Sequence, residues 1–171
     1  MAVVNRHDLA RSVLHWKVEM AVGMLCVTAV VAWALLVHGG SLSTDGELTV
    51  PWWAVAAGFF AAEAWAVHVH FRSETHSISL SELALVPGLL FLPPHQLILA
   101  QLLGAGLALA VKRRQWPTKL LFNLASFVLS SSLAIAFLDV VGISGDLHSR
   151  ATWAGVTGAA VLSSLVGIAI V

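Results

Sequence analysis

The chain has 171 residues, 58% of them hydrophobic, and its 9 Lys+Arg and 9 Asp+Glu give a formal net charge of +0 at pH 7. Soluble domains are about 45–50% apolar and about 25% charged, whereas only 11% of this chain is charged. A single soluble core of this length is therefore excluded, and the composition indicates an integral membrane protein.

Long apolar stretches recur about six times, each near the roughly 20 residues that a helix needs to cross a bilayer. We predict an all-α, polytopic membrane fold in which residues 1–171 form one transmembrane module. Residues 1–17 are expected to form a cytoplasmic, interfacial helix. The predicted spans cover about 18–38, 51–71, 78–92, 96–111, 118–138 and 151–171. A five-segment alternative treats 78–111 as a helical hairpin that does not fully cross.

The basic residues orient these spans. Eight fall on one side of the arrangement, and Arg150 alone falls on the other. Because cytoplasmic loops are enriched in Lys and Arg, this pattern places both termini in the cytoplasm of a bacterial cell, with the spans in its plasma membrane. The last apolar stretch runs to Val171 without a following basic residue. We therefore expect an input module whose parent protein continues into the cytoplasm.

The third span is unusual, because 78–92 is short and Pro87-Gly88 interrupts it. Proline removes a backbone hydrogen bond and glycine loosens a helix, so we predict a broken third helix. In transporters such segments often mark binding sites, while a kinked packing helix is the alternative interpretation.

Small residues recur four positions apart in two later spans. Gly104 and Ala108 do so in the fourth, and Gly155 and Ala159 in the sixth. This spacing lets helix backbones approach closely. We predict helix packing at these positions. A homodimer formed through the same faces is an alternative.

Polar residues inside the spans are the candidates for a ligand site. Glu63 lies about twelve residues into the second span, near mid-bilayer, where a carboxylate normally faces a partner, a cavity or a proton path. Asn123, Ser126 and Ser130 form one polar stripe on the fifth span, and Gln101 could face the same interior. One interpretation is a polar cavity bounded by Glu63, Gln101, Asn123 and Ser126. Interhelical hydrogen bonding is the other.

Residues 68–82 form the densest polar stretch, with His68, His70, His76 and Glu82 as candidate ligands. Imidazole with carboxylate suits zinc, iron or copper, although the spacing matches no strong metal signature. His68 and His70 would converge on one metal only if the segment were extended. A protonation switch and a serine-capped interfacial loop are alternatives. The sequence therefore does not identify a cofactor.

No soluble catalytic motif occurs in the sequence. The cluster Lys112-Arg113-Arg114 is too small for nucleic-acid recognition and is interpreted as a topology determinant, with contact to anionic lipid as an addition. We expect a protein that is not an enzyme, whose partner is the lipid bilayer rather than a nucleic acid.

Two stretches resemble a known family. Residues 72–82 (RSETHSISLSE), with the apolar run that follows, resemble the start of the third helix in membrane modules of actinobacterial cyclic-di-GMP signalling proteins. Residues 119–127 (KLLFNLASF) resemble the K-x-x-F-N-x-A element of those modules and of related ones ahead of HD-type phosphohydrolase domains. Residues 101–104 and 112–115 fall where the modules have a glycine-containing helix and a basic inner loop. The resemblance covers about 70–140.

The resemblance implies a sensory and anchoring module that passes a signal to a cytoplasmic GGDEF-type or EAL-type output domain in cis. The chain contains neither output sequence, so the resemblance implies no catalysis by these residues. The alternative is a small six-helix substrate-binding or transport subunit similar to vitamin importer components. A membrane protein without a ligand is a third interpretation.

Overall fold

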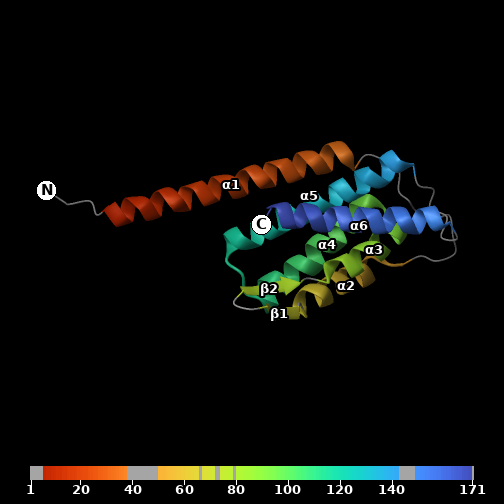
Figure 1. The fold of residues 1–171 in the computed structure, drawn as a ribbon, viewed down its shortest axis with the longest axis horizontal. Helices are drawn as coiled ribbons and strands as arrows, with labels where there is room; N and C mark the ends of the chain where they lie inside the picture. The colour runs from red at the N-terminus through yellow and green to blue at the C-terminus, as the bar shows by residue number, and fades with distance from the viewer. Residues whose placement is uncertain are drawn as a thin grey trace.

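A computed structural model describes residues 6–37, 50–65, 67–71, 74–78, 80–142 and 149–170, with side chains from residue 16 onward except those of the two strands. Helices make up most of it, as predicted, and one two-stranded antiparallel hairpin is the exception (Figure 1). In chain order the elements are α1 (Arg6–Leu36), α2 (Trp52–Ala64), β1 (Val67–Phe71), β2 (Glu74–Ile78), α3 (Ser81–Phe91), α4 (Pro94–Leu107), the π-helix η1 (Ala108–Lys112), α5 (Pro117–Val141) and α6 (Arg150–Ile170).

Four helical stretches within the described residues are long and apolar enough to cross a membrane. They are Trp16–Leu36, Pro94–Lys112, Pro117–Val141 and Arg150–Ile170. They coincide with the first, fourth, fifth and sixth predicted spans. Large apolar side chains point outward from them, including Met24 at 68% and Ile168 at 74% exposure. Such faces are unfavourable in water and suit contact with lipid.

The second and third predicted spans are not confirmed at their predicted lengths. α2 has 13 residues and α3 has 11, which gives helices of about 20 Å and about 17 Å, below the roughly 30 Å of a hydrocarbon core. The prediction of helix to residue 71 is wrong beyond Ala64, and the helix expected from 78 begins at Ser81. Pro87 lies inside α3 without ending it, so the helix continues to Phe91.

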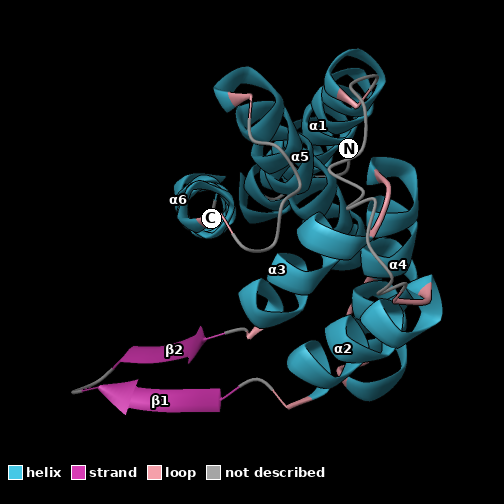
Figure 2. Cartoon of the chain, turned by 90° about the vertical axis from the view of Figure 1, so that its right-hand side faces the viewer, coloured by secondary structure: helices cyan, strands magenta, loops and turns pink. Residues whose placement is uncertain are grey.

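A hairpin takes the place of the missing helical turns. β1 pairs with β2 from Val67↔Ile78 to Phe71↔Glu74, and Figure 2 shows the hairpin projecting sideways from the helices. The sequence of β1, VHVHF, alternates apolar and polar residues with a period of two, and its valines are β-branched. Both properties favour a strand over a helix. The high apolar content of the region concealed this alternation in the span prediction.

The helices pack so that α5 contacts α1, α4 and α6, while α2 packs on α4 and α3, and α3 also meets α6. Phe59 of α2 is fully buried in the resulting core. Gly104 of α4 lies against the backbone of Ala56, where no side chain would fit. Among the other predicted packing residues, Ala108 and Ala159 are buried and Gly155 is half-buried.

Prolines and a glycine set several helix ends. Pro94 and Pro117 begin α4 and α5, a position where the missing N–H of proline costs nothing. Gly142 ends α5 with a left-handed φ of 64°, and its N–H donates to the carbonyls of Leu138 and Asp139. The α4–α5 connection, residues 113–116, follows directly from these boundaries.

Candidate functional site

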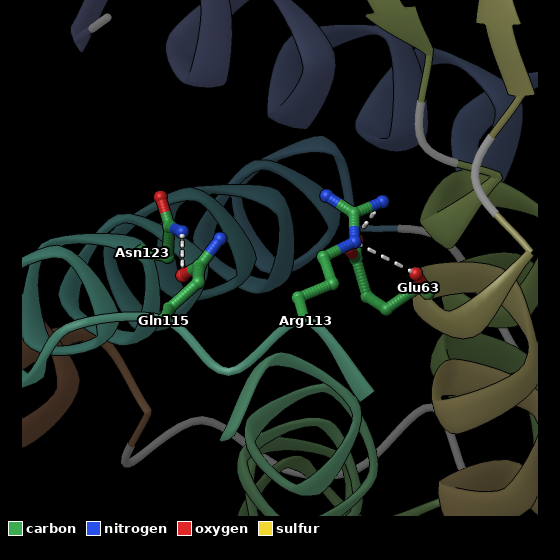
Figure 3. Close-up of polar contacts among 4 residues, drawn as sticks. All are labelled: Glu63, Arg113, Gln115 and Asn123. Carbon is green, nitrogen blue, oxygen red and sulfur yellow. Dashed lines mark hydrogen bonds and ion pairs between the residues drawn. The ribbon is translucent and has the colours of Figure 1, made fainter. Parts of the chain in front are cut away.

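Glu63 is 3% exposed and lies in the last turn of α2, one residue before the helix ends. Its predicted position near the middle of a long span is therefore corrected, because α2 stops at Ala64. A buried carboxylate needs a partner, and Arg113 supplies one. Arg113 Nη2 lies 3.8 Å from Glu63 Oε2, and Arg113 Nε donates to the backbone oxygen of Glu63 at 3.1 Å (Figure 3).

The hydrogen bond from Arg113 to the backbone oxygen of Glu63 is also favoured electrostatically. The carbonyls of the last helical turn have no partner within the helix, and together they carry partial negative charge. A guanidinium placed there satisfies one carbonyl of α2 and complements the helix dipole while it pairs with the Glu63 side chain. Arg113 thereby joins the end of α2 to the α4–α5 connection.

Arg113 reaches α2 because of the way α4 ends. The helix widens into the π-turn of η1, and the N–H of Arg113 donates to the carbonyl of Ala108 at 3.1 Å, five residues back. Such π-turns occur often at functional sites. Arg113 is half-buried, whereas Lys112 and Arg114 on either side of it are exposed. The wider turn thus separates one inward-facing cation from two outward-facing ones.

Arg114 adopts a backbone conformation usually left to glycine, with φ of 46°. An L-residue pays roughly 1–2 kcal/mol in this left-handed region. We expect Arg114→Gly to raise the free energy of unfolding by about 1 kcal/mol, measured by denaturant unfolding in detergent. Arg114→Ala, which keeps a Cβ, is expected to bring no gain. Equal stability of the two variants would contradict the left-handed conformation.

A second side-chain contact holds the other half of the connection. Asn123 Nδ2 of α5 donates to Gln115 Oε1 at 2.7 Å (Figure 3). The connection is thus tied to α2 through Arg113 and to α5 through Gln115. We call the contacts Glu63–Arg113 and Gln115–Asn123 the connection clamp.

The polar stripe of α5 makes mostly local hydrogen bonds. Ser126 and Ser130 donate to carbonyls of their own helix at 2.8 and 3.1 Å. Ser131, next in sequence, donates to Gln101 Oε1 of α4 at 2.6 Å, and both residues are buried. Within these contacts only the Ser131–Gln101 bond joins two helices, whereas Ser126 and Ser130 bond within α5.

Glu82 contacts the last helix rather than the hairpin. Ser164 of α6 donates to Glu82 Oε1 of α3 at 2.9 Å and lies 3.2 Å from the carbonyl of Ala160 in its own helix. A serine hydroxyl carries a single proton, so the carboxylate of α3 and the backbone of α6 compete for it.

The predicted metal candidates His68, His70 and His76 fall on the hairpin, whose backbone is extended. His68 and His70 were expected to converge on one metal only if their segment were extended, and its backbone is extended. Their side chains lie outside the described residues. In the part of the chain that the structure describes, no group of three or more His, Cys, Asp or Glu could hold a metal ion.

An apolar groove of about 440 Å³ runs along α2 and α3. Its wall extends from Val50 and Ala54 past Gly58 to Trp65 on one side, and Leu83 contributes to the other. Among the residues whose side chains the structure describes, Glu63, Glu82, Gln101, Asn123, Ser126 and Ser130 do not line it. In a membrane such a surface meets lipid chains.

The most informative contact partners were not among the predicted site residues. The sequence predicts for Arg113 a role in topology and lipid contact, and it predicts no site role for Gln115 or Ser164. A buried acid near a basic triplet suggests that one cation turns inward, but the sequence does not indicate which one.

Comparison with protein-family models, with curated proteins and with solved structures finds no match to this chain. The functional proposal therefore rests on the sequence of the chain and on its own contacts.

Proposed function

We propose that the chain is a membrane-embedded sensory and anchoring module. It would pass a signal to a cytoplasmic output domain of the cyclic-di-GMP turnover type, which these 171 residues do not include. The proposal comprises six spans in a bacterial plasma membrane with both ends in the cytoplasm. The distribution of Lys and Arg supports this orientation, and the resemblance of residues 72–82 and 119–127 supports the signalling role.

The observation that carries the proposal is the hydrogen bond from Ser164 to Glu82. Glu82 belongs to the stretch with the family resemblance, and α6 is the helix that would lead to the output domain. Because one hydroxyl proton has two acceptors, a small displacement of α3 against α6 would change which acceptor it bonds. A stimulus that moves α3 would in this way change the contact between α3 and α6.

The native protein from its own cells provides the test. We expect a species larger than 18.1 kDa that turns over cyclic-di-GMP. Ser164→Ala is expected to change its basal turnover severalfold, whereas Ser163→Ala, at the neighbouring position, is expected to leave it unchanged. An 18.1 kDa species without turnover, or equal behaviour of the two variants, would contradict the proposal.

A substrate-binding or transport subunit remains the alternative. It requires the predicted polar cavity between the spans, and the polar side chains expected to bound that cavity are engaged in separate contacts. No observation on the described residues favours this alternative over the sensory module.

A further inference from the structure

Positive charge gathers at the α4–α5 connection and the start of α5. Four of the nine Lys+Arg lie within residues 112–119, and this stretch contains no Asp or Glu. Arg113 is directed to Glu63 by the connection clamp. Lys112, Arg114 and Lys119 remain exposed. The structure therefore separates one structural cation from three that are available at the surface.

The backbone and Trp116 add to this surface. Trp116 precedes α5 directly and supplies no side-chain cap to it, so the amide groups of the first turn contribute positive potential. The Trp116 side chain is 83% exposed. Tryptophan at the end of an apolar helix normally lies at the level of the lipid headgroups. Lys112, Arg114 and Lys119 lie within four residues of Trp116 in the sequence, so we take them to lie near the same level.

The two helices on either side of the α4–α5 connection indicate which kind of anionic ligand this basic surface would bind. Pro94–Lys112 and Pro117–Val141, which flank the connection, are both apolar enough to span a membrane. Figure 1 shows the connection at the end of the bundle where the hairpin lies and where α6 finishes. A ligand with a phosphate at this end and acyl chains along the helices matches both parts of the surface.

We propose that Lys112, Arg114 and Lys119 bind the headgroup of an anionic phospholipid, with Trp116 packed at the same level. The proposal shares with the proposed function only the membrane setting, and it does not depend on an output domain. Bound lipid would lie beside the connection clamp, so the inner-leaflet composition would act on the segment that joins α2, α4 and α5.

The test is native mass spectrometry of the full chain in detergent, titrated with phosphatidylglycerol. We expect Lys112→Gln/Arg114→Gln to weaken binding about thirtyfold, because each of the two side chains loses a direct contact with the headgroup, worth about 1 kcal/mol. The matched control, Lys17→Gln/Arg150→Gln, removes one Lys and one Arg that are also exposed but lie outside the α4–α5 connection. It is expected to change the affinity by less than about twofold. With phosphatidylcholine, all forms are expected to bind alike.

Two results would overturn the proposal. Equal losses in the two double variants would mean that total charge alone attracts the lipid, and unchanged binding by Lys112→Gln/Arg114→Gln would remove the surface. If that variant does not fold, Lys119→Gln, which lies outside the connection, is expected to weaken binding about fivefold. Failure here would leave the sensory proposal untouched, because the assay involves no output domain.

Discussion

Arg113→Ala is expected to lower the free energy of unfolding by about 3 kcal/mol. The substitution leaves the carboxylate of Glu63, which is 3% exposed, without its cation. It also removes the donor to the last-turn carbonyl of α2. The cost of a buried charge that has lost its cation exceeds the value of the pair itself. Denaturant unfolding in detergent, followed by helical circular dichroism, measures the loss.

A double-mutant cycle separates this loss from simple side-chain truncation. Arg113→Ala/Glu63→Gln is expected to be more stable than Arg113→Ala, because the neutral amide leaves no uncompensated charge. A coupling of at least about 1 kcal/mol is expected between the two sites. Arg114→Ala, an exposed neighbour, is expected to change stability by less than about 0.5 kcal/mol. Additive effects of the Arg113 and Glu63 substitutions would show that the ion pair does not form.

Gly104→Ala is expected to destabilise the bundle by about 3 kcal/mol. A Cβ at this position would overlap the carbonyl oxygen of Ala56 and would lie 2.9 Å from the Cβ of Phe59. A backbone oxygen cannot rotate away as the end of a side chain can, so α2 would have to move off α4. The measurement is the midpoint of thermal unfolding in detergent, read on the monodisperse fraction.

Gly106→Ala is the matched control on the same helix. Its Cβ would meet Leu124 Cδ2 at 3.3 Å, the far end of a flexible side chain. Helical alanine is favoured over glycine by roughly 0.5–1 kcal/mol, so we expect this variant to match or slightly exceed the native stability. Similar midpoints for the two alanine variants would contradict the close packing of α2 on α4.

The long apolar helices were predictable because their signal is local. Length, apolar composition and the flanking prolines decide where α4 and α5 begin, and these properties are read along the chain without knowledge of its partners. The predictions failed where two local signals competed. In VHVHF the apolar residues suggested a continued span, while the alternation favoured a strand, and hydropathy alone does not separate the two.

Several polar residues of the candidate site stood out in the sequence, but their partners did not. Glu63, Glu82, Gln101 and Asn123 were identified from polarity in apolar surroundings, and each does make a side-chain contact in the fold. Their partners come from positions as far as 82 residues away. A single sequence carries no distance information, so the partners could not be assigned from it.

Residue chemistry along the chain was sufficient to establish an apolar helical protein with its basic residues gathered in a few short connections. The tertiary structure alone decided that α2 ends at Ala64, that Glu63 therefore lies beside the α4–α5 connection, and that Arg113 rather than Lys112 or Arg114 turns inward. The physical reason is that three adjacent cations are equivalent in sequence. Only the π-turn at the end of α4, set against the end of α2, makes burial favourable for one of them.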